Sequence, residues 1–359
     1  MYQPPELDDT APNHIGKYAP PPGLPPGYPR LVDFPFLSPD QIPTLYTQGY
    51  ASLHLPSDHP LLIAATTLFA TSRDFFAKPL NHKEQFHPSE FFQGKFDPSD
   101  EGWSCVEGEK ELLSVRRTRP LCPPEVTQNA QILWQECGNL LQAMMCAVEK
   151  SLDLKDGAFD NLVSKECVLP LEEKHATLLR MFRYERTADP RLVAAHHCDI
   201  GLLSLVVGSS PGLDVWNDGT KQWVAIEDDG ARKDGGLTLT LLSGRTLTRL
   251  TNERYKPGVH RVFVPPANPS SSADDGKYRY SLVFALRPHK DAIISTSALS
   301  SAVTGQFRYP LEGVKAQVVS SAIANAHWNV NVDEKERVAQ RLRLQKLKAE
   351  GIPTQSHRF

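Results

Sequence analysis

The sequence contains no long apolar run, because its apolar stretches are short and are interrupted by charged residues. Its beginning lacks the basic start and the apolar segment that together make a secretory signal. We therefore expect neither a membrane span nor secretion, and by default a cytoplasmic protein. An excess of one charge is also absent, since the formal net charge is −3 and the basic residues are spread along the chain. This distribution argues against nucleic acid as a partner.

Closely spaced cysteine pairs are missing as well. None of the six cysteines has the short paired spacing of a zinc knuckle or a redox motif. We predict free thiols in a reducing compartment, although the even count leaves disulfides as the alternative. A chain of 359 residues with 40% apolar content can bury a core without such bonds, as an enzyme-sized globular protein does.

Several features present in the sequence divide the chain. Residues 1–30 are dense in proline and predict an extended arm, and residues 31–160 predict a mostly helical N-terminal region. In this region Tyr50 to Leu55 alternates as a half-buried strand does, and Ser57 is the expected cap of the helix that follows and ends before Pro79. The helix that follows Pro124 has apolar residues at steps of three and four.

The second half of the chain has a different pattern. Residues 161–330 contain short apolar runs separated by turn signals, which is typical of an antiparallel sandwich or barrel. Residues 331–359 predict a charged C-terminal helix, from about Glu336 to Glu350, and a tail. Such a helix presents a solvated face, or lies across the mouth of a pocket. The aromatic loop before the long helix, with Phe91, Phe92 and Trp103, either lines a substrate cavity or packs as a satellite core.

One group of residues suggests chemistry. His197 and Asp199 are two positions apart, so on extended backbone both side chains point to the same face and can reach one metal. His196 points to the opposite face, which indicates a structural role, and Cys198 is too enclosed to act as a nucleophile. His260 lies far downstream and supplies a second imidazole. Two neutral nitrogens and one carboxylate leave coordination positions open, as iron(II) requires to bind a bidentate ketoacid and dioxygen.

An anion-binding pair follows the second histidine. Arg279 offers a fork of donors to a carboxylate, and Ser281 shares its strand face and adds a hydroxyl. With these elements in order, the chain resembles the isopenicillin N synthase-like family of iron(II)/2-oxoglutarate-dependent oxygenases from about residue 31 to residue 330. The segments that carry the resemblance are residues 50–55, 179–184, 197–201, 247–252, 260–262 and 279–284, with Pro288.

The resemblance implies a mainly β fold with flanking helices, in which a double-stranded β-helix (a cupin-like jelly roll) forms the core. It implies that His197, Asp199 and His260 are the catalytic iron ligands, and that Arg279, Ser281 and Tyr184 bind 2-oxoglutarate. Two positions depart from the family. Phe182 stands where relatives often have Asn, and residues 265–276 lengthen the span before Arg279, which we interpret as an enlarged hairpin loop.

The predicted activity is that of a non-haem iron(II), 2-oxoglutarate-dependent dioxygenase acting on a small organic molecule in specialised, natural-product biosynthesis. Ferryl-mediated abstraction from a C–H bond would give hydroxylation, desaturation or ring rearrangement. Two alternatives stay open: an oxidase of the same fold that uses iron and dioxygen without 2-oxoglutarate, and a catalytically silent jelly-roll binding protein. Beyond a small-molecule substrate we expect no membrane or nucleic acid partner, and a monomer or weak homodimer. Arg183 is either a site residue or half of an ordinary ion pair.

Overall fold

The computed structural model describes residues 27–92, 97–227, 237–267, 274, 276–325 and 329–349. The proline-rich arm predicted for residues 1–30 falls almost entirely outside these residues. Within them, no helix combines the length and the apolar content needed to cross a membrane. All six cysteines are described, and all are free thiols, as predicted.

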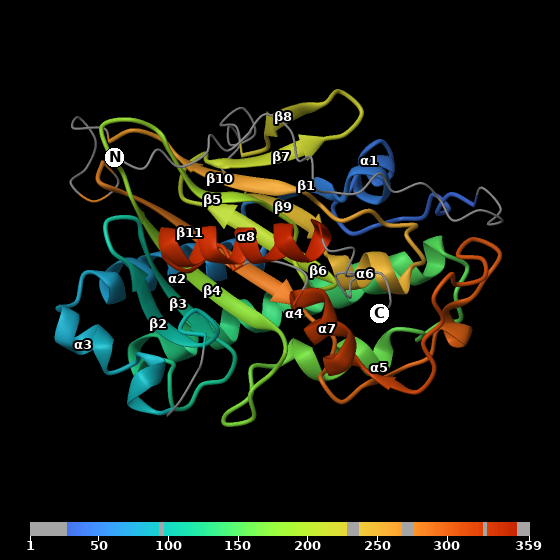
Figure 1. Ribbon diagram of the computed structural model, residues 1–359, viewed down its shortest axis with the longest axis horizontal. Helices are drawn as coiled ribbons and strands as arrows, with labels where there is room; N and C mark the ends of the chain where they lie inside the picture. Colours follow the sequence, from blue (N-terminus) through green and yellow to red (C-terminus); the bar gives the residue numbers. More distant parts are fainter. Residues whose placement is uncertain are drawn as a thin grey trace.

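Two antiparallel sheets face each other (Figure 1). The larger sheet has the order β1 (Tyr50–Leu55), β9 (Leu237–Ser243), β6 (Leu203–Gly208), β11 (Tyr278–Leu286), β4 (Leu178–Glu185), β3 (Lys110–Val115) and β2 (Gly102–Val106). The smaller sheet has the order β5 (Arg191–His197), β10 (His260–Val264), β7 (Leu213–Asn217) and β8 (Gln222–Ala225). A short pair, β12 (Ile293–Ile294) and β13 (Val314–Lys315), stands apart. Successive side chains of a strand point to opposite faces, so each sheet directs every second residue into the space between the sheets.

Helices cover the outside of the larger sheet. The two longest, α2 (Pro60–Phe76) and α4 (Pro124–Ser151), pack on each other and against β11. Their apolar faces are buried, as the spacing predicted. The remaining helices are α1 (Gln41–Gln48), α3 (Leu80–Glu84), α5 (Asp160–Val163), α6 (Arg245–Leu250), α7 (Ala316–Asn325) and α8 (Glu334–Ala349), with short 3-10 turns at Pro88–Glu90, Ser164–Cys167 and Thr296–Leu299.

Two local predictions were wrong. Ser57 does not cap α2, because the helix begins at Pro60 and the Nδ1 atom of His59 accepts the hydrogen bond from the Leu61 amide at 3.1 Å. A histidine acceptor immediately before a proline performs the function expected of serine. The segment before Arg279 is not a hairpin loop either. β10 pairs with β5 and β7, whereas β11 pairs with β4 and β6, so the chain crosses here from one sheet to the other.

Candidate active site

His197, Asp199 and His260 meet in the space between the two sheets. His197 ends β5 and His260 begins β10, and these two residues are register partners across the strand pair. Their rings lie 4.2 Å apart between centroids, and His260 Nε2 is 3.9 Å from Asp199 Oδ1. All three ligand atoms lie within 4.8 Å of one another. Such spacing allows the three side chains to contact one ion with bonds of about 2 Å.

Backbone carbonyls orient both imidazoles. His197 Nδ1 lies 2.8 Å from the Ala195 carbonyl oxygen, and His260 Nδ1 lies 3.1 Å from the Gly258 carbonyl oxygen. A carbonyl can only accept, so in each ring the Nδ1–H donates and the lone pair is left on Nε2. This tautomer is the one that a neutral, metal-binding histidine requires.

The turn that carries Asp199 is fixed by glycine and by the start of α6. The Arg245 amide donates to the Asp199 carbonyl at 2.9 Å, and the Thr246 amide donates to the Ile200 carbonyl at 3.0 Å. Gly201 lies so close to the next strand that a Cβ atom would come within 2.4 Å of the Leu286 carbonyl oxygen. Glycine at this position therefore lets the chain turn tightly directly after the carboxylate.

The charge states suit a cation. Burial, followed by repulsion from His260, lowers the pKa of His197 to about 3, so its ring is neutral at physiological pH. Burial opposes ionisation of Asp199, but the two imidazoles outweigh it and lower the pKa of this carboxyl group. Asp199 Oδ2 is buried and accepts no hydrogen bond of normal geometry from the described residues. A buried carboxylate oxygen in this condition is costly unless a cation satisfies it.

Arg279 lies at the other end of the same cavity. It is only 1% exposed, and it is the register partner of Tyr184, whose ring centroid lies 5.6 Å from the guanidinium carbon. Ser281, two residues along β11, is also buried and interacts with the Tyr184 hydroxyl. Burial raises the pKa of Tyr184 to about 12, so the phenol keeps its proton and can donate a hydrogen bond.

Glu227 forms an ion pair with Arg279, and the sequence pattern did not predict this contact. Its Oε2 atom accepts hydrogen bonds from Arg279 Nη2 at 2.7 Å and from the Leu213 amide at 2.9 Å. The Arg279 Nε atom donates to the Ser210 carbonyl at 3.0 Å. Nη1 is buried and makes no hydrogen bond with the described residues, which leaves it available for a ligand carboxylate.

Two glycines make room for the guanidinium. A Cβ atom on Gly208 would come within 2.4 Å of Arg279 Nη2, and one on Gly212 within 2.6 Å of Arg279 Nε. Larger residues at these positions would displace the arginine from the cavity.

The cavity walls come from both sheets and from the end of the chain. The lining residues are Arg180, Phe182, Tyr184, Ala194, His197, Asp199, Val206, Leu213, His260, Val262, Arg279, Ser281, Val283, Val330 and Asn331. Phe182 stacks on Tyr184 with 5.2 Å between the ring centroids and so gives this wall an apolar surface. All six predicted site residues therefore line one cavity.

Val330 and Asn331, which we call the roof of the cavity, precede α8. This helix crosses in front of the strands (Figure 1). Lys110 Nζ donates to the Val330 carbonyl at 2.8 Å and to the Val193 carbonyl at 2.9 Å. Asn329 Nδ2 donates to Ser99 Oγ at 2.9 Å, which fixes the same segment to a loop. The sequence suggested that the C-terminal helix could lie across a pocket, but it did not predict that Val330 and Asn331 line the cavity.

The other residues that the sequence analysis considered for the site do not line the cavity. Arg183 forms an ion pair with Glu111, and its guanidinium lies over the Tyr278 ring at 4.5 Å. It does not line the cavity, because its strand position points to the opposite face from Tyr184. Trp103 belongs to β2 and to the core, while Phe91 and Phe92 are exposed. Cys198 is buried, and burial raises the pKa of its thiol, as expected for an inert cysteine.

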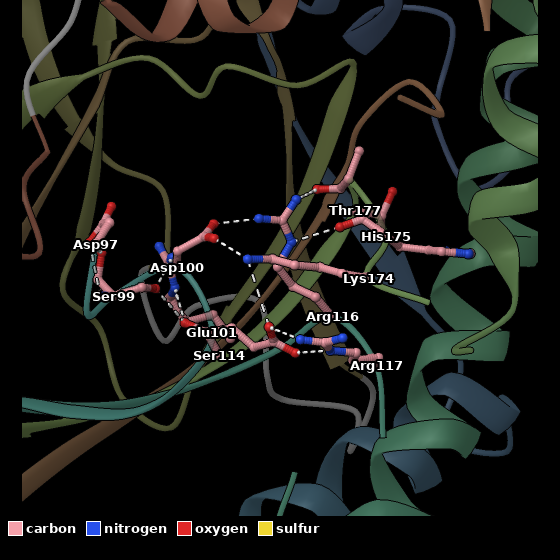
Figure 2. Close-up of polar contacts among 12 residues, drawn as sticks. Asp97, Ser99, Asp100, Glu101, Ser114, Arg116, Arg117, Lys174, His175 and Thr177 are labelled. Carbon is pink, nitrogen blue, oxygen red and sulfur yellow. Dashed lines mark hydrogen bonds and ion pairs between the residues drawn. The ribbon is translucent and has the colours of Figure 1, made fainter. Parts of the chain in front are cut away.

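A charged network joins the segment before β2, the end of β3 and the segment before β4 (Figure 2). Asp100 accepts hydrogen bonds from Arg116 and Lys174. Glu101 accepts from Arg117 at 2.8 and 3.1 Å. Arg116 also donates to the His175 carbonyl at 2.7 Å, so the network connects the end of β3 to the segment before β4.

Replacing Asp100 with Asn is expected to lower the free energy of unfolding. Burial alone would raise the pKa of Asp100, but Arg116 and Lys174 outweigh it and lower the pKa from 3.8 to about 2. Because the side chain is 35% exposed, solvent screening reduces the effect to about 1 kcal/mol. A carboxyl group whose pKa is lower in the folded state stabilises the fold at pH values above its unfolded-state pKa. This stabilisation is lost as the pH falls through its folded-state pKa. The difference from wild type should therefore be constant above about pH 5 and shrink below about pH 4.

Denaturant unfolding of both proteins across this pH range measures the effect, and Asp58→Asn, at an exposed position, is the control. A difference that stayed constant down to about pH 3 would show that the Asp100 charge is not responsible.

Comparisons with known proteins agree with this architecture. Residues 175–288 match the model of the 2OG-Fe(II) oxygenase superfamily, a segment that holds all six predicted site residues. The chain therefore carries a 2OG-Fe(II) oxygenase domain, and the prediction of a jelly-roll dioxygenase that uses iron and 2-oxoglutarate is confirmed. The comparisons do not show the narrower isopenicillin N synthase-like group.

Individual relatives are distant. The chain is 24% identical over 281 residues to "Proline hydroxylase buaE" of Petromyces alliaceus, which spans 69% of this chain and 80% of the relative. Among solved structures, a full-length Neurospora crassa protein in complex with alpha-KG aligns with a TM-score of 0.57 at 19% identity, over 77% of this chain and 86% of that one. JOX2 in complex with 2OG, Fe and JA aligns with a TM-score of 0.57 at 18% identity, over 83% of each chain. These two likenesses show the fold.

Proposed function

We propose that His197, Asp199 and His260 hold one ferrous ion and that Arg279, Ser281 and Tyr184 hold the far carboxylate of 2-oxoglutarate. The observation that carries the proposal is a pair of unsatisfied buried groups in one cavity, Asp199 Oδ2 at one end and Arg279 Nη1 at the other. A cation and a dicarboxylate would satisfy both. The donor set of two imidazoles and one carboxylate fits iron(II), which needs open positions for a ketoacid.

When bound, iron(II) with 2-oxoglutarate and dioxygen supplies an oxidant for C–H bonds, with succinate and carbon dioxide as co-products. The residues of the chain would bind and orient the reactants. The two Nδ1–H bonds keep both imidazoles neutral and aimed inward. Glu227 and the two glycines hold the Arg279 fork. Phe182, Val262 and Val283 make an apolar wall that excludes water from the reacting bond.

For the substrate we infer a small organic molecule of specialised biosynthesis, and we place the chain in the isopenicillin N synthase-like group. Two named fungal relatives support this choice: the proline hydroxylase given above, and "2-oxoglutarate-dependent dioxygenase ecdG" of Aspergillus rugulosus, which is 27% identical over 111 residues. The motif segments from residue 50 to residue 284 support the group assignment.

Turnover of 2-oxoglutarate tests the proposal. The protein, supplied with iron(II) under air, is expected to convert 2-oxoglutarate to succinate slowly without a substrate, and oxygen uptake should stop when the ketoacid is omitted. Succinate is measured by mass spectrometry and oxygen with an electrode, and protein stripped of metal by a chelator is the control.

Oxygen uptake that continues without the ketoacid would instead identify an oxidase in which Arg279 binds a substrate carboxylate. Absence of both bound iron and succinate would identify a binding protein.

A further inference from the structure

Arg180 is the one residue of the cavity that carries a charge and has no place in the proposed iron and 2-oxoglutarate sites. It shares the inward face of β4 with Phe182 and Tyr184, and it lines the cavity together with His197 and Asp199. Four residues of strand, about 13 Å, separate it from Tyr184. Two cations therefore line the cavity, Arg279 beside Tyr184 and Arg180 four residues away along the same strand.

Neutral groups hold the Arg180 side chain in place. Its Nε atom donates to Ser114 Oγ at 2.8 Å, and its Nη2 atom donates to the Ser99 carbonyl at 2.7 Å. The remaining N–H groups make no hydrogen bond with the residues that the structure describes. No carboxylate of these residues lies within ion-pair distance of Arg180 either, in contrast to Arg279, which is paired with Glu227.

The nearby carboxylates are already engaged. Asp100 binds Arg116 and Lys174 (Figure 2). Asp97 accepts from the Ser99 amide at 2.9 Å and from Asn329 at 2.9 Å. Asp97, Asp100 and Asp199 attract Arg180 from beyond ion-pair distance, whereas Arg116 and Arg287 repel it. Since Asp97 and Asp100 are bound by other groups and Asp199 belongs to the proposed metal site, the free N–H groups of Arg180 lack a direct carboxylate partner among the described residues.

We propose that Arg180 binds a carboxylate of the primary substrate. This inference rests on the proposed function, because it takes the iron and 2-oxoglutarate sites as given. A guanidinium with free N–H groups suits a planar carboxylate, which it can bind through two parallel hydrogen bonds. The apolar body of the substrate would then lie along Phe182 and Val262 toward the metal ligands. The substrate class is therefore a small carboxylic acid with an apolar body.

Matched pairs of acids and amides test this assignment. The probes are L-proline, phenylacetic acid and cyclohexanecarboxylic acid, each compared with its primary amide. Succinate release by the iron-loaded protein and the melting temperature of the manganese-loaded protein with 2-oxoglutarate are both measured. We expect at least one acid to stimulate release and to raise the melting temperature at a concentration about 10-fold below that of its amide.

Variants assign the preference to the residue. Arg180→Gln is expected to weaken the response to the acid by about 100-fold and to remove the preference for acid over amide, whereas Arg180→Lys should restore part of it. Arg183→Gln, on the same strand but facing away from the cavity, is the matched control and should keep the preference.

Three results would overturn the assignment: amides as effective as acids, no response to any acid, or an Arg180→Gln variant whose affinity for 2-oxoglutarate falls as far as that for the acid. Slow succinate release without any probe reports on the proposed function separately. Its absence contradicts the iron and 2-oxoglutarate sites, and its presence with a failed acid preference contradicts only the role of Arg180.

Discussion

Asp199→Ala is expected to abolish iron retention and, with it, all succinate production. Asp199 is the only anionic member of the proposed ligand set, and its removal leaves two neutral imidazoles to hold a divalent cation. Loss of an outer hydrogen-bond partner of a metal ligand typically weakens binding by 10- to 100-fold, so loss of the charged ligand itself should weaken it by more than about 100-fold. Metal content after anaerobic reconstitution and gel filtration measures the effect directly.

His196→Ala is the matched control for this experiment. The residue is also a histidine, it neighbours His197, and its ring lies 6.4 Å from Trp223 instead of in the cavity. This variant should keep its iron. Retention of one equivalent of iron by Asp199→Ala, with succinate release intact, would refute the ligand assignment.

Arg279→Ala should weaken binding of 2-oxoglutarate by at least about 100-fold while iron is retained. A charge-assisted hydrogen-bonded pair in a buried site contributes several times as much as an ordinary hydrogen bond. Removal of Arg279 would leave the far carboxylate of 2-oxoglutarate without its partner. The same substitution strands Glu227 in the protein interior, so the variant should also be less stable. Calorimetric titration of the manganese-loaded protein with 2-oxoglutarate gives the affinity.

A double variant, Arg279→Ala with Glu227→Gln, separates the two effects. It should recover stability, because no buried charge is left alone, but it should not recover affinity for the ketoacid. Arg183→Ala, which breaks an ion pair outside the cavity, is the control and should bind 2-oxoglutarate as the wild type does. Normal affinity in Arg279→Ala would assign the ketoacid to another group.

The sequence predicted the polar residues of the cavity because strand geometry and spacing determine them. His197 and Asp199 lie two residues apart, as do Arg279 and Ser281, and a period of two places each pair on one face. The same rule, applied from Tyr184 backwards through Phe182, would have indicated Arg180. Glu227 and Lys110 could not be found in this way, since each reaches the site from a distant segment and its partners are fixed only by tertiary packing.

The two wrong local predictions have physical causes of a similar kind. Serine is the commoner helix cap, but the conformation of the turn placed His59, not Ser57, beside the free amide. The segment before Arg279 joins two strands that follow each other in sequence, and sequence proximity favours a hairpin. In a jelly roll, however, consecutive strands often belong to opposite sheets, and hydrogen-bond register alone shows which case applies.

The cavity roof, Val330 and Asn331, is attached through a main-chain atom, so its side chains are free to vary. Lys110 holds the roof through the main-chain oxygen of Val330, a group that every amino acid possesses. Mutation can therefore change the bulk or polarity at positions 330 and 331, and with it the shape presented to incoming compounds, without loosening the attachment. Substitutions at these two positions could thus change which molecules the site accepts while the strands that form the cavity stay the same.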